Sequence, residues 1–126
     1  MEPVRQRFTL SKEERLHGKK DIAGLLAKGK FRTCKEFRYC YRPDNSLPYS
    51  RIMISVPKKL FRRAVWRNTL KRRIRESYRL QKNMIPEGRG ADILFIYNSK
   101  EIAASKDIFA SVGQILDEIR HEIGRN

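Results

Sequence analysis

The chain has 126 residues, with 29 Lys and Arg against 14 Asp and Glu, so its net charge at neutral pH is +15. A chain of this length can bury a hydrophobic core in one domain, and its 40% apolar content excludes a disordered basic tail. No apolar run approaches the roughly 20 residues that a membrane span requires. We therefore expect residues 1–126 to form one folded domain with an anionic partner and no membrane contact.

The N-terminal half is expected to contain one helix and two strands. A capping box of Ser11 and Glu14 precedes a helical stretch over 20–28, which a glycine ends. Apolar and polar residues alternate over 37–42 and again over 52–56, as in half-buried strands. Because a turn-rich loop joins these two strands, we expect them to pair antiparallel as a hairpin.

The C-terminal half is expected to contain two helices and one strand. Helical spacing over 68–82 predicts the second helix, with Asn68 as its N-cap. The continuous apolar run 93–97 is typical of a strand buried on both faces, and an amphipathic helix follows, capped by Ser105 or Asp107. The order helix, strand, strand, helix, strand, helix predicts a single α+β domain around a small mixed sheet.

Cysteine and histidine content bears on compartment and metal binding. A disulfide-stapled secreted domain of this size would carry more cysteines than Cys34 and Cys40, so both are expected to be thiols. The N-terminus has no apolar stretch that resembles a signal peptide, and the expected location is the cytoplasm. His17 and His121 are isolated and no Cys-x-x-Cys pair is present, so no metal site is predicted.

The positive charge is concentrated in one segment. Residues 51–82 carry 12 basic and 1 acidic side chain, against 12 and 6 over residues 1–50 and 5 and 7 over residues 83–126. On the predicted helix, a spacing of four residues places a cationic stripe beside the apolar face that packs on the core. The stripe consists of Arg67, Lys71, Arg75 and Arg79, with Arg72 beside it.

Arginine predominates in this segment, and its planar guanidinium matches phosphate oxygens, which favours a nucleic-acid partner. Glu76 is the only acid that could relieve the repulsion along the helix. Two alternative interpretations are a highly charged solvated face and a basic amphipathic helix of the kind that binds membranes or calmodulin.

The same segment carries a longer motif. It reads Ser-Val-Pro-Lys-Lys over 55–59 and Ala-Val-Trp-Arg-Asn-Thr-Leu-Lys-Arg-Arg-Ile-Arg-Glu over 64–76. This pattern resembles the signature of the bacterial ribonuclease P protein subunit. The resemblance implies a subunit of an endoribonuclease whose catalytic RNA removes the 5′ leader of precursor tRNA, with Mg²⁺ bound mainly by the RNA subunit and the substrate. It also implies no catalytic residue and no organic cofactor in the protein, and a left-handed crossover between two parallel strands.

The resemblance implies two RNA-binding sites. The first contacts the RNA subunit through Lys58, Lys59, Arg62, Arg63, Arg67, Asn68, Lys71, Arg72, Arg75 and Arg79. The second is a cleft between the first helix and the sheet, which receives the leader and is lined by Ile22, Leu26, Arg38, Cys40, Arg42, Met53 and Ser55. Residues 1–10 match the family weakly and could be disordered in the absence of RNA.

Several residues depart from the family pattern. Ile22 and Leu26 stand where other members often carry phenylalanine, and Cys40 stands where an aromatic is often found. Electrostatic contacts from the strand arginines would then replace base stacking, and core packing is the alternative role for the two helix residues. Trp66 could stack on a base or serve as a half-buried anchor beside Val65.

Other classes of function would need other sequence features. A ribosomal or other structural RNA-binding protein with no processing role would share the size, the charge and a related fold. A DNA-binding regulator would need Asn, Gln or Ser among its arginines to read base edges. A stand-alone nuclease would need a carboxylate cluster for metal ions, which this sequence lacks.

Overall fold

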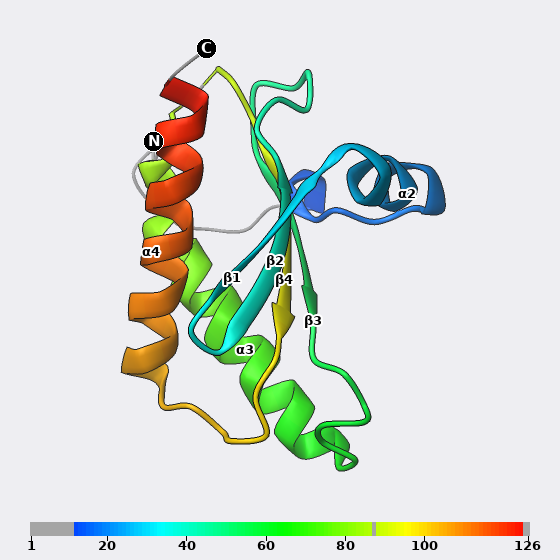
Figure 1. The fold of residues 1–126 in the computed structure, drawn as a ribbon, viewed down its shortest axis with the longest axis vertical. Helices are drawn as coiled ribbons and strands as arrows, with labels where there is room; N and C mark the ends of the chain where they lie inside the picture. Colours follow the sequence, from blue (N-terminus) through cyan, green and yellow to red (C-terminus); the bar gives the residue numbers. More distant parts are fainter. Residues whose placement is uncertain (1–11, 87, 125–126) are drawn as a thin grey trace.

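The computed structural model describes residues 12–86 and 88–124. Two expectations, the capping residue Ser11 and the order of residues 1–10, lie outside the described residues. The elements (Figure 1) are η1 (Lys12–Glu14), α2 (Lys19–Lys28), β1 (Lys30–Cys34), β2 (Phe37–Arg42), β3 (Arg51–Ser55), α3 (Ala64–Gln81), η2 (Lys82–Met84), β4 (Asp92–Tyr97) and α4 (Ser105–Gly124). The predicted α+β class is confirmed, and β1 is a strand that the sequence pattern did not predict.

The strands form one mixed sheet in the order β1-β2-β4-β3. β2 pairs antiparallel with both β1 and β4, whereas β3 pairs parallel with β4. The predicted hairpin between β2 and β3 is therefore wrong, because β4 lies between them. The parallel pair of β3 and β4 agrees with the strand arrangement that the family resemblance implies, and α3 lies in the connection between the two.

The loop between β2 and β3 explains their separation. Its backbone bonds to the segment before β4: the Asn45 N–H donates to the Gly90 carbonyl (3.0 Å), and the Gly90 N–H donates to the Leu47 carbonyl (2.8 Å). A Cβ at Gly90 would lie 1.9 Å from the Tyr49 carbonyl oxygen, so only glycine allows this close approach. The loop thus crosses the start of β4 and brings β3 to the far edge of that strand.

The two faces of the sheet are covered differently. Helices α3 and α4 pack on one face, and α2 stands on the other (Figure 1). The main core lies under α3 and α4 and includes the aromatic side chains Phe37, Tyr39, Phe95 and Tyr97. A smaller cluster under α2 consists of Leu16, Leu25, Cys40 and Leu94. Both cysteines are free and buried, which confirms the expectation of thiols. None of the described helices has the length and hydropathy to cross a bilayer.

Helix α3 begins at Ala64, before the predicted start, and Arg63 is its N-cap. Asn68 therefore lies inside the helix, and its prediction as the N-cap is wrong. The Nη1 atom of Arg67 donates to two carbonyls of the preceding loop, both at 2.8 Å, and holds that loop against the first turn. The earlier start brings Trp66 into the helix, among the cations of its N-terminal end.

Candidate nucleic-acid interfaces

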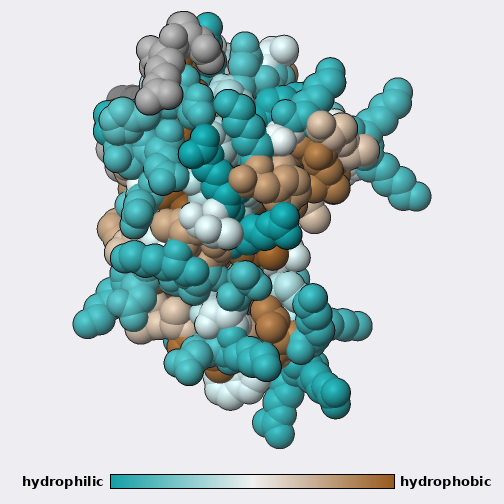
Figure 2. Space-filling view, in the orientation of Figure 1, coloured by the Kyte–Doolittle hydropathy of each residue, from teal (hydrophilic) through white to brown (hydrophobic). Residues whose placement is uncertain are grey.

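A surface of unpaired cations, which we call the basic surface, lies on α3 and on the loop before it. It consists of Lys58, Lys59, Arg62, Arg63, Lys71, Arg72 and Arg75, with the exposed Asn68 among them. Across residues 12–86 and 88–124, none of these seven cations forms an ion pair or a hydrogen bond. Figure 2 shows hydrophilic side chains projecting at the lower end of the molecule, where Figure 1 places the start of α3. A polyanion would relieve the repulsion among these charges.

Two of the predicted RNA contacts already have partners within the protein. Arg67 donates to the loop carbonyls described above, and Arg79 Nε donates to Glu76 Oε1 at 2.9 Å. The predicted four-residue stripe is therefore divided. Its middle members, Lys71 and Arg75, are available to a ligand, whereas its two ends are engaged in contacts that hold the helix and its loop.

The second predicted site lies on the sheet face that carries α2, which we call the α2 face. Strand register aligns its side chains in three rows across the sheet. The outer row contains Thr33, Arg38, Ile96 and Ser55, the middle row contains Phe31, Cys40, Leu94 and Met53, and the inner row contains Arg42, Asp92 and Arg51. Leu25 of α2 packs on Cys40 and Leu94 of the middle row, and Ile96 of the outer row packs against the same cluster. The uncovered part of this face is its β1–β2 end, where Phe31, Thr33 and Arg38 are exposed.

The residues predicted to line the leader cleft differ in accessibility. Cys40 is fully buried, with its Sγ atom 3.7 Å from the Leu25 carbonyl oxygen, and burial raises the pKa of its thiol. Ile22 and Met53 pack against the same cluster as partly buried side chains. Leu26 is 46% exposed. Core packing is thus the observed role of Ile22, whereas Leu26 faces solvent.

An exposed aromatic side chain lies on the unpredicted strand β1. Phe31 is 42% exposed and is the register partner of Cys40. The Cζ atom of Arg38 lies 4.6 Å from the Phe31 ring centroid, within range of a cation–π interaction. β1 has four exposed residues and one buried residue, so its sequence lacks the alternation of apolar and polar residues that predicts a strand. Phe31 thus places an aromatic ring beside Cys40, on the neighbouring strand.

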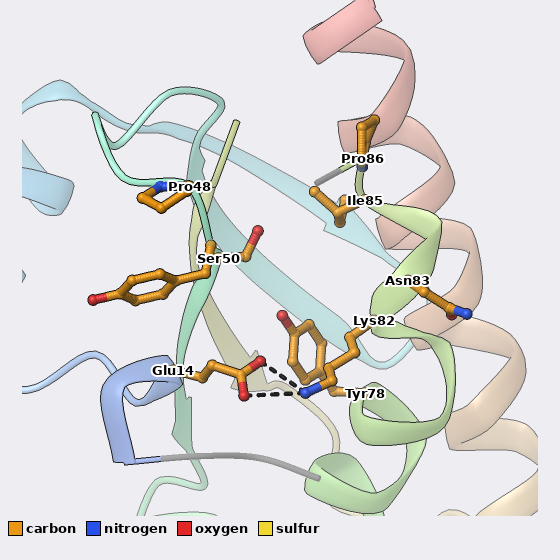
Figure 3. Close-up of a pocket in the computed structure, with 9 residues that line it drawn as sticks. Glu14, Pro48, Ser50, Tyr78, Lys82, Asn83, Ile85 and Pro86 are labelled. Carbon is orange, nitrogen blue, oxygen red and sulfur yellow. Dashed lines mark hydrogen bonds and ion pairs between the residues drawn. The ribbon is translucent and has the colours of Figure 1, made fainter. Parts of the chain in front are cut away.

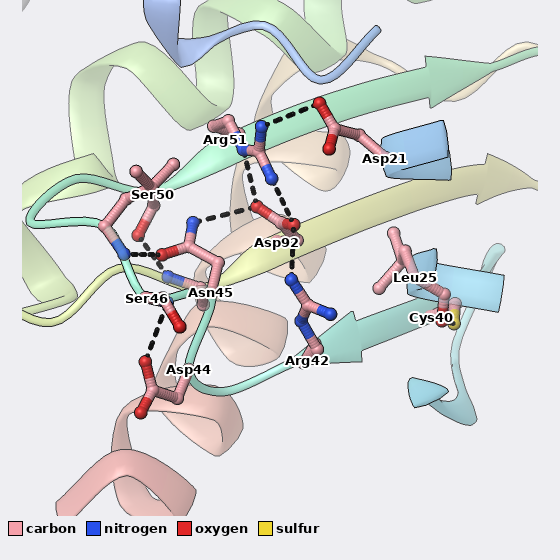
Figure 4. A network of polar contacts seen from close by, with 12 residues as sticks. Asp21, Leu25, Cys40, Arg42, Asp44, Asn45, Ser46, Ser50, Arg51 and Asp92 are labelled. Atoms are coloured by element: carbon pink, nitrogen blue, oxygen red, sulfur yellow. Dashed lines mark hydrogen bonds and ion pairs between the residues drawn. The ribbon is translucent and has the colours of Figure 1, made fainter. Parts of the chain in front are cut away.

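The inner row is a buried ion network that links α2 to the β2–β3 loop (Figure 4). Asp92 is fully buried, and Arg51 donates to its two oxygens at 2.9 and 2.8 Å and to Asp21 of α2 at 3.1 Å. Asn45 Nδ2 donates to Asp92 Oδ1 at 2.8 Å, and Arg42 Nη2 lies 3.6 Å from Oδ2. The hydrogen bonds to Asp92 raise the pKa of Arg51. Arg42, predicted to face the leader, thus has an internal partner for its charge.

A separate cavity of about 180 Å³ lies between η1, the loop before β3 and the C-terminal end of α3 (Figure 3). Lys82 Nζ donates to both carboxylate oxygens of Glu14, at 3.0 and 2.9 Å, and this pair joins η1 to η2. Tyr78 also borders the cavity, and burial raises the pKa of its hydroxyl. No residue predicted to bind RNA lines this cavity, so it belongs to neither interface.

Comparison with known proteins bears on both surfaces. A family model described as Ribonuclease P matches residues 10–120. The chain is 42% identical over 80 residues to the ribonuclease P protein component of Porphyromonas gingivalis, a match that covers 62% of this chain and 58% of that protein. It is 37% identical over 92 residues to the ribonuclease P protein component of Thermotoga maritima, which covers 73% of this chain and 75% of that protein. The chain thus spans less than two thirds of the Porphyromonas relative.

Two solved structures share the fold. The RNase P protein from Thermotoga maritima has a TM-score of 0.71 at 31% identity, covering 83% of this chain and 96% of that one. The RNase P protein from Staphylococcus aureus also has a TM-score of 0.71, at 28% identity, covering 83% of this chain and 94% of that one. The family match includes every residue of the basic surface and of the α2 face. The chain belongs to the family of bacterial ribonuclease P protein components.

Proposed function

We propose that this protein is the ribonuclease P subunit that binds the catalytic RNA and assists removal of the 5′ leader from precursor tRNA. The observation that carries the proposal is the basic surface, whose seven cations have no acidic partner among the described residues. Phosphate groups would relieve their repulsion, and binding would gain free energy from the release of counterions. Membership of the family supports RNA of this class as the polyanion.

The α2 face is the second contact in this proposal, and it would bind the single-stranded leader. Single-stranded nucleic acid is usually held by cations that follow the backbone and by aromatic rings on which bases stack. The uncovered part of the face has one of each, Arg38 and Phe31. In this arrangement Phe31 takes the stacking role, and Cys40 supports the packing of α2.

The cleavage chemistry is assigned to the RNA subunit. The Mg²⁺ that the reaction needs would be bound mainly by the RNA subunit and the substrate. On the α2 face, the buried carboxylate of Asp92 does not fit a metal ion, because Arg51 and Asn45 occupy its oxygens. The protein would act instead by neutralising phosphates around the bound substrate.

Reconstitution tests this function. Precursor tRNA is incubated with ribonuclease P RNA alone, with the protein alone and with both, across a series of Mg²⁺ concentrations. We expect the protein to lower the Mg²⁺ concentration for half-maximal leader removal several-fold, because its cations neutralise phosphates that Mg²⁺ otherwise must screen. The protein alone should cleave nothing. Cleavage without RNA would contradict the proposal, and so would recovery of ribosomal RNA, in place of one abundant non-ribosomal RNA, with protein purified from cells.

Substitution of Phe31 tests the leader contact. In the reconstituted complex, Phe31→Ala should weaken binding of precursor tRNA roughly 5- to 150-fold, the effect of losing one base–aromatic stack. Binding of mature tRNA, which has no leader, should not change. Phe31→Tyr is the matched control, because it keeps a ring at the same place. An equal loss for both tRNAs would show that Phe31 supports the complex in some way other than leader stacking.

A further inference from the structure

Trp66 is an exposed aromatic side chain on the first turn of α3. Its side chain is 42% exposed, and the adjacent Val65 is 59% exposed, so a large part of the indole surface faces solvent. A buried indole N–H usually has a hydrogen-bond partner, but no described residue accepts one from Trp66. The core of the protein therefore does not account for this tryptophan.

The backbone that carries Trp66 is held in place by the loop before it. The N–H groups of Leu60 and Phe61 donate to the Pro57 carbonyl, at 3.1 and 3.3 Å. Phe61 is only 8% exposed, and its ring centroid lies 5.9 Å from that of Tyr97. Arg67 holds the same loop through its two 2.8 Å hydrogen bonds. Because the first turn is already fixed, a ligand that meets the indole ring loses little free energy to ordering it.

The charges around Trp66 favour a polyanion rather than an apolar protein partner. Arg62 and Arg63, which immediately precede the helix, are exposed and without acidic partners among the described residues. Glu76, the only acid on α3, is already paired with Arg79. An aromatic ring cannot bond to phosphate, but it can stack on a base, because every base presents a π face.

Helix geometry separates Trp66 from Lys71 and Arg75, the two middle cations of the α3 stripe. At 100° per residue, Trp66 lies about 140° around α3 from Lys71 and about 180° from Arg75. A base on the indole ring would therefore be a contact additional to those two cations. We propose that Trp66 is a stacking platform for an unpaired base of the RNA subunit. This inference rests on the proposed function, since it requires that α3 binds that RNA.

The chain contains one tryptophan, so its tryptophan fluorescence, excited where tyrosine does not absorb, reports on this position alone. We expect titration with ribonuclease P RNA to quench the emission and to protect the indole from acrylamide. Inorganic polyphosphate, a polyanion without bases, is the matched ligand and should bind without either effect. Equal quenching by polyphosphate would overturn the stacking proposal, because the signal would then follow charge alone.

Substitution separates stacking from charge. Trp66→Ala should weaken RNA binding roughly 5- to 150-fold while leaving the slope of log affinity against log salt unchanged. Trp66→Phe should retain most of the affinity, and Val65→Ala is the control for a change on the same exposed turn. Urea unfolding of each variant shows whether the fold is kept. If wild-type protein binds RNA with a steep salt dependence and Trp66→Ala binds equally well, stacking is refuted while the proposed function stands. If wild-type protein does not bind the RNA, the proposed function itself fails.

Discussion

Replacing Arg51 with leucine is expected to lower the free energy of unfolding by about 3–5 kcal/mol, the usual effect of removing one partner of a buried ion pair. Asp92 is fully buried, and Arg51 provides two of its three short hydrogen bonds. In the variant, Asn45 and the more distant Arg42 would be the remaining partners of a buried carboxylate. Urea unfolding followed by far-ultraviolet circular dichroism measures the change.

Two further variants isolate the ion network. Arg38→Leu removes an exposed arginine from the outer row of the same face and should change the free energy of unfolding by less than about 0.5 kcal/mol. The double variant Arg51→Leu/Asp92→Leu should recover part of the loss, because apolar replacement of a whole buried pair is often close to neutral. A loss below about 1 kcal/mol in the single variant would contradict a stabilising role for this network.

The strands show where sequence patterns suffice and where they do not. The alternation over 37–42 and the apolar run over 93–97 identified β2 and β4. Burial of one face favours alternating apolar residues, and burial of both faces favours a continuous apolar run. β1 was not predicted because it is an edge strand with a single buried residue, Cys34. Its extended backbone is held by antiparallel pairing with β2, which no pattern within β1 itself reveals. The hairpin error has a related cause, since periodicity identifies strands but not their neighbours. The separation of β2 from β3 depends on backbone contacts between the loop and Gly90.

The candidate sites show the same division at the level of side chains. Spacing identified which residues share a face of α3, but it could not tell that Arg67 bonds to loop carbonyls while Lys71 has no internal partner. Strand parity placed Cys40 on the correct face of the sheet. Whether that side chain reaches a ligand depends on the position of α2, which the Arg51–Asp21 contact helps to set. Patterns thus predict faces, whereas tertiary contacts decide which members of a face are accessible.

The division of the α3 stripe leads to an expected difference between two double variants. Lys71→Ala/Arg75→Ala removes two cations without internal partners, so the slope of log affinity for RNA against log salt should become shallower by about 1.8 on duplex or about 1.4 on single-stranded RNA. Binding to ribonuclease P RNA is measured between low and moderate salt. The fold should be unaffected, because neither side chain makes an ion pair or a hydrogen bond within the described residues.

Arg67→Ala/Arg79→Ala is the matched variant, since it also removes two positive charges from the same helix. It should change the slope less and the stability more, because Arg67 braces the loop before α3 and Arg79 is hydrogen-bonded to Glu76. Equal slopes for the two variants would contradict the division of the stripe. Each lost phosphate contact reduces the number of counterions released on binding, and so makes the salt dependence shallower. If neither variant changes the slope of log affinity against log salt, the RNA contact must lie elsewhere on the protein.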